Sequence, residues 1–284
     1  LVTSRTRTIA LFVPSMRIFE VPFRQKLLIR LQEALAEAGY GIVIQSYGTA
    51  GRGCGPLGEV MADAGLFFYF GGGNDRALAE IRQPGFPLLI FGRHPDPALP
   101  TIHLDNRGAM HALTGRVLAA GHRRLLLVDA YRGDLFNQDG RAGIADAVAA
   151  ADADLEILDG LRLDFDAYYA GNLVDLGLRV AESVLARARR PDALLFHSDT
   201  LALAALRAFQ DRGLDIPRDL AIAANGCDDY CALLRPALDR ASPDPAQAAQ
   251  VCAGALLAHL GGGPLVGRTL PLVVEAGGTL VPST

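Results

Sequence analysis

The chain has 284 residues, half of them hydrophobic, and a formal net charge of −4. This length can bury the core of one large domain or of two lobes. The acidic balance argues against nucleic-acid binding by these residues themselves, because neutralising phosphates requires a basic face. No apolar run approaches the roughly 20 residues that a membrane-spanning helix needs, and the first residues do not resemble a signal peptide. The four cysteines lack zinc-ligand spacing, so we expect reduced thiols and a cytoplasmic protein.

Strand and helix patterns alternate along nearly the whole chain. In the first section they predict strands at residues 8–13, 41–45, 66–70 and 87–91, and helices at 24–38, 57–64 and 75–82. A proline-rich stretch at 93–100 leads to a strand at 101–104 and a helix at 106–120. The second section predicts strands at 124–128, 155–158, 194–196, 220–224 and 269–275, and helices at 141–151, 167–187, 201–212 and 246–260. Repeated strand–helix units predict the α/β class, with two doubly wound parallel-sheet lobes.

Polar residues follow two neighbouring strands of the second section. Ser198 and Asp199 come after residues 194–196, and Asp228 and Asp229 come after residues 220–224. In open α/β sheets, ligands bind just beyond the carboxyl ends of the strands. The pattern therefore predicts half of a small-molecule site, although Ser198 and Asp199 are also residue types that cap a helix.

Several motifs are spread along the chain in a specific order. They are TIALFVP at 8–14, Gly92-Arg93 followed by TIHLDN at 101–106, the Gly-His pair at 121–122, GLDIPRDLAI at 213–222 and GCDD at 226–229. Together they resemble the effector-binding core of the lactose-repressor family of bacterial transcription regulators. That resemblance implies a type I periplasmic-binding-protein-like fold, with lobes joined by three crossovers near residues 97–101, 240–242 and 267–269. The lobes would comprise residues 1–99 plus 242–267 and residues 100–241 plus 268–284.

The resemblance also implies a function. The chain would be the effector-binding and dimerisation domain of a DNA-binding regulator, and it would sense a small sugar-like effector in the cleft between its lobes. A helix-turn-helix segment absent from these residues would bind operator DNA, and the protein would act as a homodimer without a membrane partner. The alternative with the same fold is the solute-binding protein of a sugar ABC transporter.

In the first lobe, the loop after the first strand offers Ser15, Arg17, Phe19 and Phe23 as ligand contacts. An aromatic pair can stack on a sugar or base face, but both rings could equally staple the following helix. Asn74 and Asp75 follow a strand and three glycines, which let a backbone approach a ligand closely. Asp75 can accept hydrogen bonds from hydroxyl groups, and a role as helix N-cap is an open alternative.

In the second lobe, Asp228 lies at the position of the family's effector-contacting acid, and a carboxylate there suits a polyol. We expect Asp229 to have a loop or capping role. Ser198 stands where many relatives have Asn, which suggests a different ligand or a bridging water. Phe165 matches a position that is often aromatic and lines the cleft, with a buried core role as the alternative.

One departure from the family pattern concerns an arginine. Relatives usually have an effector-contacting Arg three residues before a Gly, whereas this chain reads Gly140-Arg141-Ala142-Gly143. The expected position is therefore Gly140, and Arg141 comes one residue late. One residue corresponds to about 100° of rotation on a helix, so Arg141 either replaces the usual contact after a local shift or the contact is missing.

Catalytic chemistry has no positive support in the sequence. The histidines do not form a paired metal-binding pattern, and no Gly-Lys-Ser/Thr follows the glycine triplet. No nucleophile-elbow signature is present. We therefore expect neither a metal, a cofactor nor catalytic residues.

Overall fold

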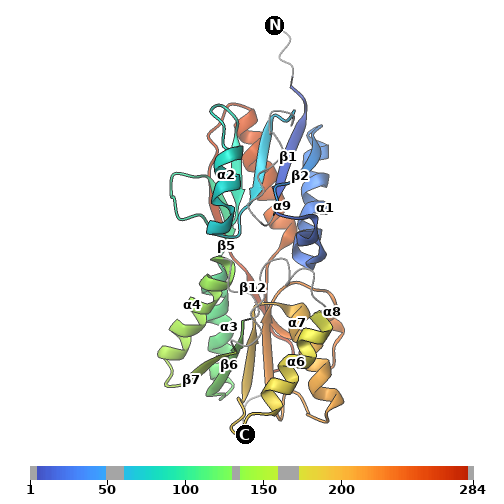
Figure 1. The fold of residues 1–284 in the computed structure, drawn as a ribbon, viewed down its shortest axis with the longest axis vertical. Coiled ribbons are helices and arrows are strands. Elements are labelled where there is room, and N and C mark those ends of the chain that lie inside the picture. The colour runs from blue at the N-terminus through green and yellow to red at the C-terminus, as the bar shows by residue number, and fades with distance from the viewer. Residues whose placement is uncertain (1–4, 49–60, 130–134, 159–172, 281–284) are drawn as a thin grey trace. The chain divides into compact units, whose positions relative to one another are not determined.

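The computed structural model describes residues 5–48, 61–129, 135–158 and 173–280 (Figure 1). The chain divides into two compact units, of which the first comprises Leu1–Leu104 and Asp244–Leu270 and the second Asp105–Pro243 and Pro271–Thr284. It therefore passes between the units three times, after Leu104, Pro243 and Leu270. The predicted fold class is confirmed, because each unit is built on one six-stranded, mainly parallel sheet.

The first unit is an all-parallel sheet with the order β11-β5-β4-β3-β1-β2. Its strands are β1 (Thr8–Val13), β2 (Gly41–Ser46), β3 (Ala64–Phe68), β4 (Leu88–Phe91), β5 (Thr101–Leu104) and β11 (Arg268–Leu270). Its helices are η1 (Met16–Glu20), α1 (Pro22–Glu37), η3 (Gly72–Asn74), α2 (Asp75–Ile81) and α9 (Pro245–Leu260). Helices α1 and α9, which are far apart in the sequence, pack side by side (Figure 1).

The second unit has the strand order β12-β10-β9-β8-β6-β7, and only β12 is antiparallel to its neighbour. Its strands are β6 (Arg124–Val128), β7 (Asp154–Leu158), β8 (Ala193–Phe196), β9 (Ala221–Asn225), β10 (Asp239–Ser242) and β12 (Val273–Glu275). The helices are α3 (Asn106–Ala119), α4 (Leu135–Ala149), α6 (Leu173–Leu185), α7 (Asp199–Asp211) and α8 (Tyr230–Leu233).

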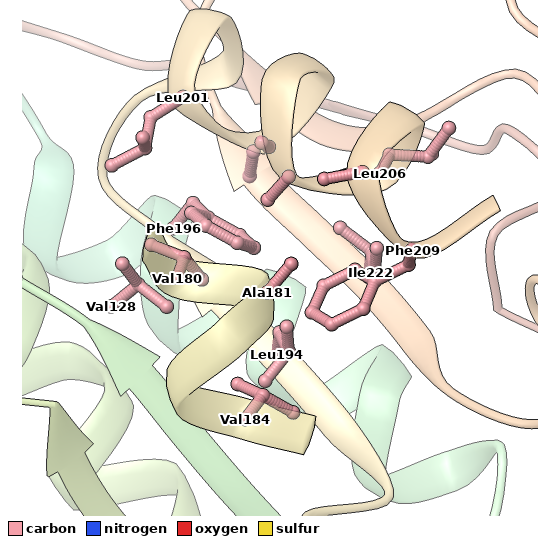
Figure 2. Packing of buried hydrophobic residues seen from close by; sticks show 14 of the residues in the cluster. Val128, Val180, Ala181, Val184, Leu194, Phe196, Leu201, Leu206, Phe209 and Ile222 are labelled. Carbon is pink, nitrogen blue, oxygen red and sulfur yellow. The ribbon is translucent and has the colours of Figure 1, made fainter. Parts of the chain in front are cut away.

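A hydrophobic core lies between α6, α7 and one face of the second sheet (Figure 2). Val180 and Val184 of α6 and Phe209 of α7 pack with Phe196 of β8 and Ile222 of β9, and all five side chains are buried. Helices α3 and α4 cover a second core on the other face. Because both faces are covered, the central strands β6, β8 and β9 are nearly continuous apolar runs, as is typical of parallel sheets.

Several predicted elements need correction. The expected strand at 269–275 is two strands in different units, because the chain leaves the first sheet after Leu270 and Pro271 cannot donate to a ladder. Helix α4 begins at Leu135 rather than Arg141. Strand β3 begins at Ala64, where the sequence predicts the end of a helix, and residues 57–60 of that predicted helix lie outside the described residues. The expected helix at 167–187 is described only from Leu173 and ends at Leu185.

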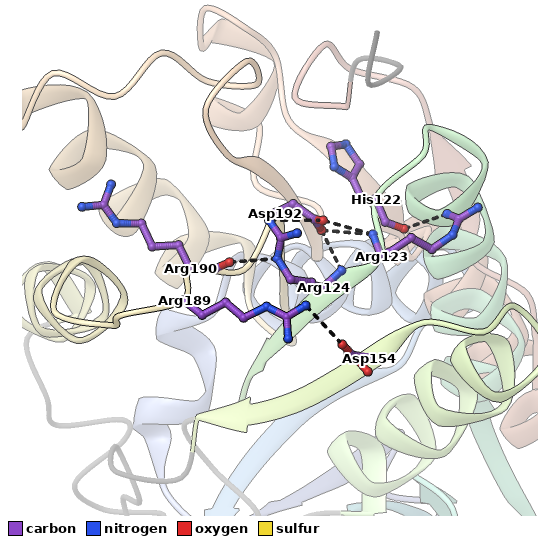
Figure 3. Close-up of polar contacts among 7 residues, drawn as sticks. All are labelled: His122, Arg123, Arg124, Asp154, Arg189, Arg190 and Asp192. Carbon is purple, nitrogen blue, oxygen red and sulfur yellow. Dashed lines mark hydrogen bonds and ion pairs between the residues drawn. The ribbon is translucent and has the colours of Figure 1, made fainter.

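The Gly-His turn at residues 121–122 lies at the amino end of β6 (Figure 3). The Asp192 carboxylate accepts hydrogen bonds from the backbone N–H groups of Arg123, at 3.2 Å, and Arg124, at 2.9 Å. Asp192 directly precedes β8, so this motif aligns the starts of two neighbouring strands. None of the helices in the described part of the chain has the length and apolar character that a membrane crossing requires.

Candidate functional site

The loop after β1 lies at the carboxyl edge of the first sheet. Ser15 caps the short helix η1, because its Oγ accepts from the Arg17 N–H at 3.3 Å. Arg17 itself is exposed. Both residues therefore lie where a ligand at the strand ends could meet them.

The two phenylalanines of this loop pack against the ends of neighbouring strands. The Phe19 ring meets Phe68 of β3 edge-on, with centroids 6.1 Å apart, and the Phe23 ring stacks on Phe91 of β4 at 6.2 Å. Both residues are only half-buried. The rings thus hold the loop against the sheet while part of each stays exposed.

Asn74 and Asp75 organise the loop after β3. Asn74 Oδ1 accepts from the Phe70 N–H at 2.9 Å. Asp75 is the first residue of α2 and Asn74 occupies the N-cap position, so the alternative that Asp75 is the N-cap is wrong. Asp75 Oδ1 instead accepts from the Tyr69 hydroxyl at 2.6 Å, and burial together with this carboxylate raises the Tyr69 pKa. The Asp75 side chain remains 59% exposed.

In the second unit, Asp228 lies in a tightly bonded loop after β9. Its N–H donates to Asp199 Oδ2 at 2.6 Å, and its own Oδ1 accepts from the Tyr230 N–H at 3.0 Å. Asp228 is buried, whereas Asp229 is exposed and occupies the N-cap position of α8 without a side-chain capping bond. Asp229 thus has the expected place in the loop before α8, but the side-chain hydrogen bond to the first residue of that helix comes from Asp228.

Asp199, which the sequence predicts as part of a strand-tip ligand site or as a capping residue, fixes this loop. Burial, chiefly, raises the pKa of its carboxyl group. Gly226 has a φ of +153°, and a Cβ atom there would lie 2.1 Å from Asp199 Cγ, so only glycine fits. On the other side, the Arg240 guanidinium donates to the Asp228 carbonyl at 2.6 Å and pairs with Glu275 at 2.8 Å. The Asp228 carboxylate is consequently well positioned.

Ser198 caps helix α7, because its Oγ accepts from the Leu201 N–H at 3.3 Å. The capping role expected from the sequence is confirmed. Ser198 is half-buried at the carboxyl end of β8.

The departure at residues 140–143 has a structural explanation. Gly140 is buried on α4, and a Cβ atom there would stand 2.8 Å from Cε1 of His197. Arg141 Nη1 lies 3.6 Å from Oδ2 of Asp129, a buried residue directly after β6. Arg141 thus brings a guanidinium to the end of β6, while the histidine ring fills the space beside Gly140.

His197 directly follows β8 and belongs to no paired metal-binding pattern in the sequence. It is 9% exposed, and both ring nitrogens are buried without a hydrogen-bond partner among the described residues. Burial, and secondarily the charge of Arg141, lower its pKa to about 4. A histidine that ends an otherwise apolar strand was the available signal. Phe165 lies outside the described residues.

A family described as "Periplasmic binding protein-like domain" matches residues 114–276. The chain is 28% identical over 238 residues to the HTH-type transcriptional regulator CelR of Thermobifida fusca, covering 81% of this chain and 67% of that protein. It spans about half to two thirds of the length of the first curated relatives that it matches.

Solved structures share the fold. The complex of the transcriptional regulator CelR with cellobiose superposes with a TM-score of 0.80 at 22% identity, covering 97% of this chain and 85% of the other. The structure of a regulator named as LacI from Bacillus cereus subsp. cytotoxis superposes with a TM-score of 0.82 at 20% identity, covering 98% of this chain and 99% of the other.

Proposed function

We propose that this chain, which belongs to the family of periplasmic binding protein-like domains, is the effector-binding core of a lactose-repressor-type transcription regulator. The resemblance found in its motifs is confirmed by its relatives, which are named transcription regulators rather than enzymes. The observation that carries the proposal is the likeness to one such regulator along 81% of the chain.

The effector we propose is a sugar, bound at the carboxyl edges of the sheets. The fixed carboxylate of Asp228 supports this class, because a carboxylate accepts hydrogen bonds from neighbouring hydroxyl groups. Solved structures with this fold include one with cellobiose and one with bound ribose. The contacts we propose are Ser15, Arg17, Phe19, Phe23, Asn74, Asp75, Gly140, Arg141, Phe165, Ser198 and Asp228.

The remaining parts of the proposal concern the whole regulator. We propose that a helix-turn-helix segment outside these residues binds operator DNA, that the regulator is a cytoplasmic homodimer and that it catalyses no reaction. The effector regulates DNA binding only if it binds one conformation of the core more tightly than the other.

Asp228 gives the test of the effector proposal. A thermal-shift screen of neutral sugars, sugar acids, sugar phosphates and purines should find a sugar that stabilises the chain. Asp228→Asn should then lower the affinity for that sugar by roughly 10- to 100-fold, because the hydrogen bond between the sugar and a charged carboxylate is lost. The Asn side chain keeps an oxygen that accepts from the Tyr230 N–H.

Asp229→Asn is the matched control, since it changes the neighbouring exposed acid. It should leave the titration unchanged. Equal effects of the two variants, or no effect of Asp228→Asn, would show that Asp228 is not the recognising acid.

The alternative is a transport receptor of the same fold. Sedimentation equilibrium separates the two, because a regulator core that dimerises should sediment as a dimer and a solute receptor as a monomer. A monomer at micromolar concentration, with or without sugar, would count against the regulator.

A further inference from the structure

The His197 side chain lies at the centre of the second unit's carboxyl edge. Strand β8 runs between β6 and β9, so His197 follows a strand whose neighbours end near Asp129 and Asp228. Its two ring nitrogens are buried, and the described residues offer neither of them a hydrogen bond. Buried polar groups are nearly always hydrogen-bonded, so an orphaned pair indicates a partner supplied from outside the protein.

Gly140 provides the space that the ring occupies. A Cβ atom at position 140 would stand 2.8 Å from Cε1 and 3.0 Å from Nδ1 of His197. Any side chain on α4 at this point would therefore push the ring aside. The glycine and the histidine form a matched pair, and the ring's position depends on both.

The charges around the ring indicate which ligands fit. The burial that lowers its pKa to about 4 keeps the imidazole neutral near pH 7, with one nitrogen that donates and one that accepts. The arginines described at this edge already have acidic partners, Arg141 with Asp129 and Arg240 with Glu275. Asp228 adds a carboxylate. Among the described residues of the second unit, a phosphate or carboxylate ligand would meet these acids without a spare cation, whereas hydroxyl groups both donate and accept.

We propose that His197 is a ligand-contacting residue that exchanges hydrogen bonds with hydroxyl groups of an uncharged sugar, and that this edge rejects phosphorylated and acidic sugars. This proposal rests on the proposed function, and it narrows the sugar effector to the class of uncharged sugars. The half-exposed side chain of Arg141 interacts electrostatically with the ring. A sugar bound to His197 would therefore also contact this guanidinium or move it aside.

The experiment uses isothermal titration of the whole chain with cellobiose, with glucose against glucose 6-phosphate, and with ribose against ribose 5-phosphate. At least one neutral sugar should bind, and the phosphorylated partner of a binding monosaccharide should bind at least tenfold more weakly. His197→Phe keeps an aromatic ring and removes both nitrogens, so it should lower the affinity for the neutral sugar roughly tenfold or more.

Two further variants guard against trivial outcomes. His111→Phe alters an exposed histidine of α3 in the same unit and should bind like the wild type. Gly140→Ala favours helix formation but displaces the His197 ring, so it should reduce binding while the protein stays folded by circular dichroism. In ¹⁵N-histidine-labelled wild type, the sugar should shift the His197 ring resonances.

The outcomes separate the two proposals. Failure of every neutral and phosphorylated sugar to bind the wild type would overturn the proposed effector class and this inference with it. Binding of a neutral sugar that His197→Phe leaves unchanged, with unmoved His197 resonances, would overturn the role of His197 alone. Preferential binding of a sugar phosphate would overturn the uncharged class and leave a sugar sensor.

Discussion

Burial of the His197 ring makes the folded state sensitive to acid. Its pKa in the folded chain is about 4, below the ordinary value of 6.5, so unfolded chains bind the proton more readily. The associated stability is therefore fully present above pH 6.5 and is lost as the pH falls from 6.5 to 4. By linkage this amounts to about 3 kcal/mol. Urea unfolding of the wild type and His197→Phe at several pH values should show the steeper loss in the wild type, and parallel curves would contradict it.

At this scale, the sequence predicts residues whose role depends on their neighbours in the chain. Ser198 follows an apolar strand and precedes a helix, which is enough to predict its cap. The pairing of His197 with Gly140 depends on which side of α4 meets the end of β8. That orientation changes by about 100° for each residue, so the sequence leaves open whether position 140 or 141 faces the strand. The sequence also does not show that Asp228, besides being the candidate ligand contact, accepts the hydrogen bond from the Tyr230 N–H at the start of α8.

The start of strand β8 gives a prediction at the scale of elements. Asp192→Ala would leave the backbone N–H groups of Arg123 and Arg124 without their acceptor (Figure 3). Lost hydrogen bonds of this kind should lower the free energy of unfolding by about 1–3 kcal/mol.

The control lies in the same figure. Asp154→Ala removes an exposed acid of β7 whose carboxylate lies 4.0 Å from the Arg189 guanidinium. Surface pairs of this kind contribute about 0–1 kcal/mol. The two variants are compared by urea unfolding. Circular dichroism is the suitable probe, because the chain has no tryptophan whose fluorescence could be followed. An equal loss in both would show that Asp192 does not align the strands.

Elements were predictable where apolar runs and breakers coincide, as in β1 and α9. They were missed where composition hides them. Strand β10 reads Asp-Arg-Ala-Ser, and its charged residues are satisfied by partners far away in the sequence. The run at 269–275 looks continuous, yet its halves pair with β5 and β10 in different units. Local patterns specify a strand's existence better than its partner.

For the whole molecule, the decisive feature is that neither unit is made of one continuous segment. Helix α9 returns to pack on α1, and the last segment of the chain returns to β10. Hydrophobic periodicity alone predicts two α/β sections in order. The returns came only from the family resemblance, because they depend on contacts between residues far apart in the sequence.

The end of the chain tests how strongly such a return stabilises a unit. Thr279 is fully buried, and its Oγ1 accepts from the Asp239 N–H at 2.8 Å. In the other direction, Asp239 Oδ2 accepts from the Thr279 N–H at 3.0 Å, and Asp239 Oδ1 pairs with Arg116 at 2.9 Å. Thr279→Val keeps the shape and removes the hydroxyl, which leaves a buried N–H without its acceptor. The second unit should therefore lose about 1–3 kcal/mol of stability.

Thr269→Val provides the comparison, because it removes an exposed hydroxyl that contacts His103 at 3.1 Å in the first unit. Hydrogen exchange monitored by mass spectrometry can follow the two units separately. Faster exchange in β9 and β10 for Thr279→Val, with unchanged exchange in β1 and β3, is the expected result. Unchanged exchange throughout would mean that packing alone holds the returning segment, and uniform acceleration in both units would mean that the units unfold as one.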